Sequence, residues 1–217
     1  MNNHLKGNDM KVLVIGAGNM GSGFVKQLVA AGHQVTVTSR DGAKAQAVAR
    51  QFGAKAVPAE SSANGQDAVL VATSYADAVN ALRGVGVLPG ATVVDITNPL
   101  TPDYMGLTIG HSTSAAEQIA QALPGVEVVK GFNTVFAQVL AEGANLAGQK
   151  VTVFLASDSE RAKQTARALG ESMGFQTMDA GGLKNARYLE PLGGLNIYFG
   201  YGAGLGTGIA PSWIRKN

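Results

Sequence analysis

Three glycines near the N-terminus carry the first indication of ligand chemistry. They stand in VLVIGAGNMGSGF as Gly16, Gly18 and Gly21, the G-x-G-x-x-G spacing of a turn between a strand and a helix. The first glycine makes the bend, the second lets the backbone approach a pyrophosphate, and the third lets the helix pack on the sheet. The free N–H groups at the start of the helix face the phosphates. The spacing therefore predicts a dinucleotide site.

The end of the next strand predicts which dinucleotide binds. VTVTSRDGAK places Ser39, Arg40 and Lys44 where many such sites have an acid that binds the adenosine ribose. Serine and arginine can bind a 2′-phosphate, and each charge-assisted hydrogen bond contributes about 1.5–3 kcal/mol. Two such bonds favour NADP over NAD by roughly two orders of magnitude or more. We interpret Asp41 as the cap of the following helix. The alternatives are that Asp41 binds the ribose and that Arg40 and Lys44 lie on a solvated helix face.

Polar residues follow three further predicted strands. An Asn amide there can meet the nicotinamide ribose or carboxamide, and a proline ends its strand. Each residue alone is ordinary for a turn, but the carboxyl ends of the strands share one edge with the glycine turn. We expect that edge to carry Thr73, Ser74 and Tyr75, then Asn98 and Pro99, then Asn133 and Thr134.

The groups needed for acid–base or metal catalysis do not stand out. The chain has no cysteine, its three histidines are scattered, and none of its five tyrosines begins a Tyr-x-x-x-Lys pair. We interpret His33, Lys130 and Asp95 as structural and predict neither a catalytic side chain nor a metal site. Hydride transfer to a stacked flavin-like ring requires proximity and an apolar pocket rather than an acid. A non-catalytic NADP(H) sensor and a reductase of small carbonyl or imine substrates stay open as alternatives.

Short apolar runs alternate with helical stretches along the chain, which is typical of a doubly wound, mostly parallel α/β sheet. We expect one domain over residues 1–217, with the first six strands in Rossmann order, a flexible extension at 1–10 and a small C-terminal extension. Ser114 and Glu117 predict a capping box. The expected strands are Val12–Ile15, Val35–Thr38, Lys55–Val57, Ala68–Thr73, Thr92–Ile96, Val126–Lys130, Val151–Ala156 and Phe175–Met178. The expected helices are Phe24–Ala31, Ala43–Phe52, Ala76–Leu82, Ala115–Leu123 and Glu160–Met173.

The composition limits the class of protein and the kinds of partner to expect. A chain that is 46% hydrophobic and 15% charged folds around a real core, and a net charge of +2 gives no reason to expect nucleic acid. Residues Pro191–Ile214 carry no charge but contain seven glycines, so we interpret them as a buried wall rather than a membrane span. We expect a cytoplasmic protein with a small-molecule redox partner, and the uncharged tail makes a homodimer plausible.

Longer stretches resemble a known family, the NADPH-dependent 8-hydroxy-5-deazaflavin oxidoreductases. The similarity lies in IGAGNMGSG, SRDGAK, MDAGGLKNARYLEPLGGLNI and GAGLGTGIA, and residues 179–196 are its most specific part. VVKGFNTV is also similar to the NADPH domains of membrane ferric reductases.

The resemblance implies NADP(H) contacts at Asn19 and Met20 besides those above. It also implies a deazaflavin in a cleft closed by residues 174–217, with Asn133, Thr134, Leu195 and Asn196 around the acceptor. Archaeal members have His-Thr where this chain has Asn133-Thr134, so FMN and FAD stay open as alternative acceptors.

Overall fold

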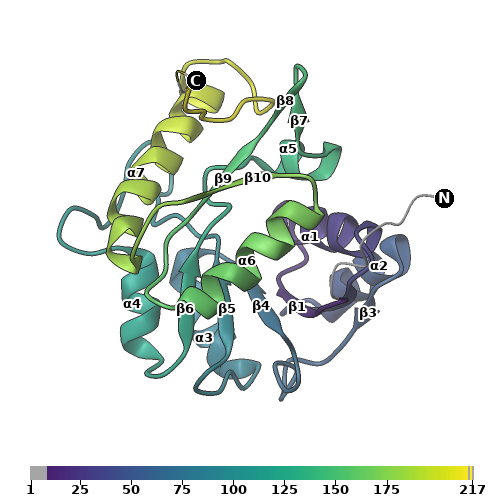
Figure 1. Ribbon diagram of the computed structural model, residues 1–217. Coiled ribbons are helices and arrows are strands. Elements are labelled where there is room, and N and C mark those ends of the chain that lie inside the picture. The colour runs from purple at the N-terminus through teal and green to yellow at the C-terminus, as the bar shows by residue number, and fades with distance from the viewer. Residues whose placement is uncertain (1–8, 215, 217) are drawn as a thin grey trace.

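The computed structural model describes residues 9–214 and 216. Its centre is a six-stranded parallel sheet in the order β3-β2-β1-β4-β5-β6 (Figure 1). The strands are β1 (Lys11–Ile15), β2 (Gln34–Thr38), β3 (Lys55–Ala56), β4 (Ala68–Val71), β5 (Thr92–Asp95) and β6 (Glu127–Lys130). This is the Rossmann order, so the predicted fold class and the predicted order of the first six strands are confirmed.

Both faces of the sheet are buried, as the nearly continuous apolar strands predicted. In β1, Val12 and Val14 join one hydrophobic cluster, while Leu13 and Ile15 join the other. Successive side chains of a strand point to opposite faces, so each face has its own core under its own helices. The first face is covered by α1 (Asn19–Ala30) and α2 (Gly42–Phe52), and the second by α3 (Tyr75–Gly84) and α4 (Ala115–Ala122).

The chain after β6 adds two further sheets of two strands each. The two strands predicted after the sixth pair in parallel with each other, and an antiparallel bridge from Lys130 to Ala156 joins them to β6. The elements of this part are α5 (Ala137–Glu142), β7 (Asn145–Leu146), β8 (Gln149–Lys150), β9 (Thr152–Leu155), α6 (Glu160–Ser172) and β10 (Gln176–Asp179). The predicted last strand therefore packs beside the Rossmann sheet without extending it.

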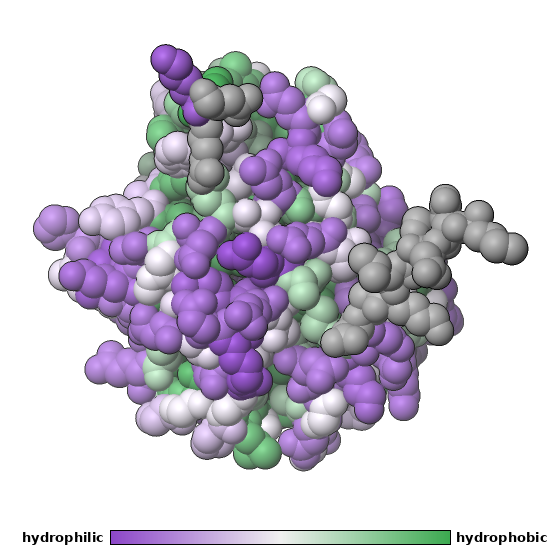
Figure 2. Space-filling model, viewed as in Figure 1, coloured by the Kyte–Doolittle hydropathy of each residue, from purple (hydrophilic) through white to green (hydrophobic). Residues whose placement is uncertain are grey.

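The C-terminal segment corrects one prediction. It forms a 3₁₀ turn (Leu183–Asn185), helix α7 (Ala186–Ile197) and a π-helical turn (Tyr198–Gly202). The expected buried wall is largely exposed, because Tyr198, Phe199, Tyr201, Leu205 and Trp213 each keep at least 41% of their surface accessible. Figure 2 shows hydrophobic side chains near this end of the chain, above a mostly hydrophilic face. Within the described residues, no helix combines the length and hydropathy of a membrane span.

Two predictions concern where segments begin: the capped start of α4 and the N-terminal extension at residues 1–10. Ser114 Oγ accepts from Glu117 N at 3.2 Å and donates to Glu117 Oε2 at 2.7 Å, so α4 begins at the predicted cap. Of the predicted extension at 1–10, residues 1–8 lie outside the described part. Met10 already belongs to the fold, since its carbonyl accepts from Gln34 N at 2.9 Å.

Candidate functional site

The glycine turn after β1 is shaped by two close backbone approaches. Gly16 has a φ of +119°, and a Cβ there would lie 2.3 Å from the carbonyl oxygen of Ala72. At Gly21 a Cβ would lie 1.9 Å from the carbonyl oxygen of Gly16. Gly18 differs, because a Cβ there would meet nothing within 4 Å, and this residue lines a cleft of about 800 Å³. Backbone atoms therefore fill the space beside Gly16 and Gly21, whereas the space beside Gly18 is free, as expected where a pyrophosphate lies against the turn.

The start of α1 leaves its backbone N–H groups without a side-chain cap. Its N-cap residue is Gly18, and its first turn holds no acidic residue. Among the other helices, α2, α4 and α6 are capped by the side chains of Asp41, Ser114 and Ser159, whereas α3, α5 and α7 also lack a side-chain cap. Uncapped N–H groups at the positive end of a helix suit a phosphate, so this helix start also fits the predicted dinucleotide.

The cationic corner after β2 holds its charges in exposed ion pairs. Arg40 Nη2 lies 3.3 Å from Asp77 Oδ2 on α3, and the Arg40 side chain is 88% exposed. Lys44 Nζ lies 3.8 Å from Asp41 Oδ2, and Ser39 Oγ donates to the Asp41 carbonyl oxygen. Exposed pairs contribute about 0–1 kcal/mol, so both cations can turn to a stronger anion. The structure brings the three predicted residues to one corner and adds Asp77, which no sequence pattern indicated.

Asp41 takes the structural role interpreted from the sequence. Its Oδ1 accepts from the backbone N–H groups of Ala43 at 3.1 Å and Lys44 at 3.2 Å. The capping interpretation is confirmed, and one of the two carboxylate oxygens is thereby committed to α2.

Two adjoining clefts, of about 800 and 690 Å³, run along the carboxyl ends of the strands. They share Met20, Ala72, Ile96, Asn98, Leu100 and Tyr104. We call their union the strand-end groove. Among the predicted residues, it is lined by Gly18, Asn19, Met20, Thr73, Ser74, Tyr75, Asn98, Asn133, Thr134 and Asn196. Pro99 lines neither cleft; its carbonyl accepts from Thr108 N at 2.7 Å and so holds the loop that follows.

Asn98 and Asn133 form a reciprocal pair in this groove. Asn98 Nδ2 donates to the Asn133 carbonyl at 2.8 Å, and Asn133 Nδ2 donates to Asn98 Oδ1 at 2.9 Å and to the Leu189 carbonyl at 2.7 Å. Gly193 of α7 closes on the pair, because a Cβ there would lie 2.7 Å from Asn98 Oδ1. Asn133 Oδ1 is buried without a hydrogen-bond partner among the described residues. Such an unsatisfied acceptor fits a donor from a ligand or an ordered water.

The residues predicted around the acceptor divide into two groups. Thr134 and Asn196 line the larger cleft together with Asn133, and Asn196 Nδ2 donates to the Thr134 carbonyl at 3.1 Å. Leu195 lies outside this cleft and is 49% exposed. Neighbouring residues of an α-helix differ by about 100° around its axis, so a helix that turns Asn196 to the cleft turns Leu195 away.

Several residues that line the larger cleft were missed by sequence reasoning. Tyr104 and Met105 come from the loop after β5, and Phe136, Ile197 and Tyr201 come from the region after β6 and from the tail. They share apolar or aromatic character but no spacing that would single them out. Only the fold brings these segments to the same edge of the sheet.

A buried charge cluster lies under the groove. Lys130 Nζ is 2.6 Å from Asp95 Oδ2 and 2.9 Å from Glu190 Oε1, and all three side chains are at most 1% exposed. It also donates to the Thr97 carbonyl at 2.7 Å. Glu190 accepts from the first N–H groups of α4, at Ala115 and Ala116. The structural interpretation of Lys130 and Asp95 is confirmed, and Glu190 is the partner that the sequence did not reveal.

Tyr75 is the phenol that lines the groove beside the predicted nicotinamide end, and it is poorly suited to donate a proton. Burial, and then the carboxylates of Glu190 and Asp95, raise the pKa of Tyr75 above its ordinary value. Its hydroxyl donates to Gln118 Oε1. A general acid works best with a pKa near the operating pH, so this phenol is tuned in the wrong direction. Over the described part of the chain, no group of three or more histidine and acidic side chains is arranged to hold a metal ion.

Comparisons with known proteins agree with this geometry. Residues 11–99 match a family model described as NADP oxidoreductase, coenzyme F420-dependent. Metalloreductase STEAP3 of Rattus norvegicus is 27% identical over 182 residues, which cover 84% of this chain but only 36% of that protein. The F420-dependent NADP reductase of Methanothermobacter marburgensis is 28% identical over 202 residues, covering 84% of this chain and 89% of the relative.

A solved structure gives the same answer at the level of the fold. A candidate F420-dependent NADP reductase from Arthrobacter sp. FB24 superposes with a TM-score of 0.85 at 27% identity, covering 95% of this chain and all of that one. The resemblance predicted from the sequence is thus confirmed: over most of its length the chain is similar to proteins named as F420-dependent NADP reductases.

Proposed function

We propose that the protein transfers a hydride directly between NADP(H) and a deazaflavin or flavin ring. The observation that carries the proposal is the continuity of the strand-end groove, which joins the open glycine turn at Gly18 to the cleft beside α7. A deazaflavin is the preferred acceptor because of two relatives, the one from Methanothermobacter marburgensis and the one from Arthrobacter. Each is matched over most of its own length and most of this chain, and each is named as F420-dependent. FMN and FAD are the alternative acceptors.

On the dinucleotide side, NADP(H) supplies or accepts the hydride through its nicotinamide ring. The protein's own part is to bind and orient. The turn at Gly16, Gly18 and Gly21 and the N–H groups of Asn19 and Met20 receive the pyrophosphate. Ser39, Arg40 and Lys44 bind the 2′-phosphate. The nicotinamide end lies along the strand-end residues Thr73, Ser74, Tyr75 and Asn98.

On the acceptor side, the C-terminal segment 174–217 closes the cleft through Asn196, Ile197 and Tyr201. Asn133 and Thr134 supply the polar contacts, and Ile96 and Phe136 supply apolar ones. Apolar lining excludes water and holds one ring against another, which is the proximity effect that such a transfer needs. The phenol beside the nicotinamide end, Tyr75, is poorly suited to donate a proton, which favours a ring acceptor over a carbonyl that requires an acid.

The test is an anaerobic reaction of the protein with NADPH labelled by deuterium at the reactive carbon. Coenzyme F420, FMN and FAD are offered separately, and mass spectrometry follows the label. Direct transfer to coenzyme F420, whose reacting ring atom is a carbon, predicts loss of reduced-nicotinamide absorbance and deuterium on the reduced acceptor. Label from the F420 reaction that appears in solvent would exclude direct transfer. Deuterium received by a flavin nitrogen exchanges with water, so the reactions with FMN and FAD are followed by absorbance and by the slower rate with labelled NADPH.

The same mixture separates the proposal from a binding-only role. Tight NADPH binding by calorimetry, without oxidation by any acceptor, would indicate a sensor and overturn the proposed reaction. Oxidation with only one acceptor would identify the physiological class.

A further inference from the structure

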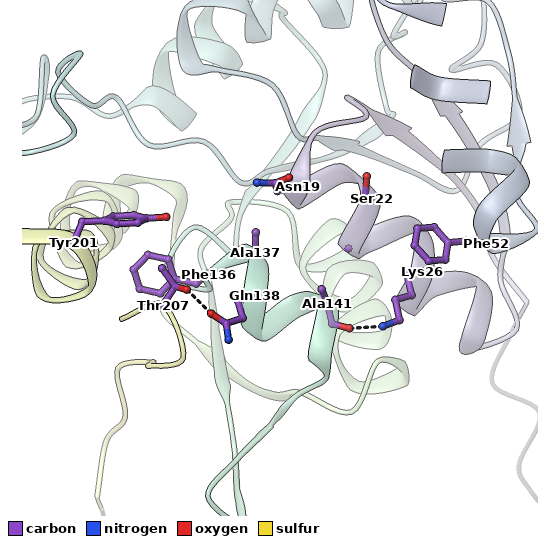
Figure 3. Close-up of a pocket in the computed structure, with 11 residues that line it drawn as sticks. Asn19, Ser22, Lys26, Phe52, Phe136, Ala137, Gln138, Ala141, Tyr201 and Thr207 are labelled. Atoms are coloured by element: carbon purple, nitrogen blue, oxygen red, sulfur yellow. Dashed lines mark hydrogen bonds between the residues drawn. The ribbon is translucent and has the colours of Figure 1, made fainter. Parts of the chain in front are cut away.

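A side pocket of about 400 Å³ opens next to the larger cleft (Figure 3). The two cavities share Asn19, Phe136, Ala137 and Tyr201 in their linings, so a molecule in the cleft can continue into the pocket without leaving the protein surface. None of the roles described above uses this pocket.

One face of α1 forms a long side of the pocket. Asn19, Ser22, Gly23 and Lys26 all line it, and their spacing places them on the same face of the helix. Seven residues at 1.5 Å per residue separate Asn19 from Lys26 by about 10 Å. The pocket is therefore elongated, with neutral polar groups near the cleft and a cation at the far end.

The opposite side is made by α5 and the tail. Figure 3 shows Gln138 and Ala141 facing α1, with Tyr201 at the cleft end and Phe52 beside Lys26. The hydroxyl of Thr207 donates to Gln138 Oε1, which ties the tail to α5. Amide and hydroxyl groups thus line this elongated pocket, which we call the channel, together with the aromatic rings of Phe52, Phe136 and Tyr201.

Lys26 is held at the end of this channel but is not neutralised. Its Nζ donates to the Ala141 carbonyl at 2.7 Å, and no ion pair engages it among the residues the structure describes. An ammonium has three N–H donors, so two are left for an anion. The channel can therefore accept a negatively charged group at its far end.

We propose that this pocket binds the side chain of the hydride acceptor, a polyhydroxylated chain that carries a phosphate. The phosphate lies on Lys26, and the hydroxyls lie along Asn19, Ser22 and Gln138. The inference rests on the proposed function for the ring in the cleft. It adds the place of the phosphate-bearing side chain that coenzyme F420, FMN and FAD each carry beside the ring.

Two matched pairs of acceptors test the subsite: riboflavin against FMN, and the unphosphorylated deazariboflavin against coenzyme F420. Binding is measured by the fluorescence of each ring in the presence of NADP+, so the readout does not require turnover. In at least one pair we expect the phosphorylated member to bind about ten-fold more tightly or better, the size of one charge-assisted hydrogen bond. Lys26→Met should remove that difference, Lys26→Arg should restore it, and Lys150→Met on the exposed β7–β8 hairpin should leave it unchanged.

The outcomes separate this inference from the proposed function. If Lys26→Met leaves the preference for the phosphorylated member intact, or no preference exists in either pair, the subsite is wrong even where hydride transfer proceeds. If the preference is present and depends on Lys26 but no acceptor is reduced, the subsite holds and the proposed reaction fails. Melting temperatures of the variants show whether the fold is retained.

Discussion

Among single residues, Arg40 is a predicted phosphate-binding group that forms only a weak, exposed ion pair with Asp77. Its pair with Asp77 is exposed and contributes about 0–1 kcal/mol, whereas each bond to a phosphate contributes about 1.5–3 kcal/mol. We expect Arg40→Glu to weaken NADPH binding at least ten-fold and to leave NADH binding nearly unchanged, measured by calorimetry at one salt concentration. Asp77→Asn is the matched variant, which should retain or modestly strengthen NADPH binding. Equal NADPH affinity in Arg40→Glu and wild type would refute the assignment of the corner.

Gly18 offers a second test, because binding and folding separate there. A Cβ at Gly18 meets nothing within 4 Å of protein, so Gly18→Ala should leave the melting temperature almost unchanged. The same methyl would occupy the space assigned to the pyrophosphate, and we expect NADPH affinity to fall about ten-fold or more. Gly84→Ala, at the end of α3, adds a methyl that also meets nothing and should change neither quantity. Undiminished NADPH affinity in Gly18→Ala would place the dinucleotide elsewhere.

The residues that could be predicted are those whose signal is local. Gly16 to Gly21 and Ser39 to Lys44 each form a compact pattern in the chain, and the structure brings each set together at its predicted place. Asp77 and Glu190 matter through partners 37 and 60 residues away, at Arg40 and Lys130. Spacing in the sequence contains no information about such contacts, because the fold creates them.

Among the elements, the helices that carry a clear period were found and those without one were missed. α5 has only six residues, too few to show a helical period. α7 contains Pro191 and two glycines, which are normally helix breakers. Contact with the sheet overrides these preferences, since Gly193 lets the helix approach the Asn98–Asn133 pair. Similarly, α1 begins at Asn19 rather than at the predicted Phe24, because Gly21 is the residue that packs on the turn.

Helix α7 depends on the buried cluster beneath it. Glu190 binds Lys130 and the first N–H groups of α4, so it fastens the helix that carries Asn196 and Ile197 to the sheet. Glu190→Gln leaves Lys130 paired with Asp95, but it replaces one of the two carboxylate oxygens by an amide that cannot accept from the N–H groups of α4, and a buried group left unsatisfied costs about 1–3 kcal/mol. We expect Glu190→Gln to lower the free energy of unfolding toward this size, measured by urea denaturation. Glu60→Gln, on the exposed loop before β4, should change it by less than about 0.5 kcal/mol. Comparable stabilities of the two variants would show that α7 is held by packing alone.

In the whole molecule, the six-stranded sheet and the β9–β10 sheet are joined through side chains that come from distant parts of the chain. Phe132 makes edge-on contacts with Phe24 of α1 and with Phe175 before β10, at centroid distances of 5.1 and 5.9 Å. His33 makes a polar link between the same regions, since its Nε2 lies 2.9 Å from Ser172 Oγ on α6. The β9–β10 sheet is thereby fixed to the Rossmann core at two places, one at Phe132, which also lines the strand-end groove, and one at His33.

His33 makes this link dependent on pH. Its Nδ1 accepts from Met10 N at 3.2 Å, so the neutral ring donates from Nε2 to Ser172. Protonation would place an N–H at Nδ1 against the N–H of Met10. Burial lowers the pKa of His33 below its ordinary value of 6.5, with the carboxylate of Asp9 opposing the shift. Below that value the unfolded chain binds a proton that the folded protein resists, so stability falls as the pH falls toward the folded pKa.

We therefore expect the free energy of unfolding to decline as the pH is lowered from about 7.5 to about 5.5, with a slope from this group of at most about 1.4 kcal/mol per pH unit. His33→Gln should be less stable than wild type at the higher pH, since it loses fitted hydrogen bonds, but should show a flatter profile. The matched variant is His111→Asn, at an exposed position with a φ of +60° that asparagine tolerates, and it should keep the wild-type slope. Urea denaturation at several pH values measures all three. Parallel profiles for His33→Gln and wild type would mean that other groups set the acid sensitivity, and that the link between α6 and the Rossmann sheet survives protonation.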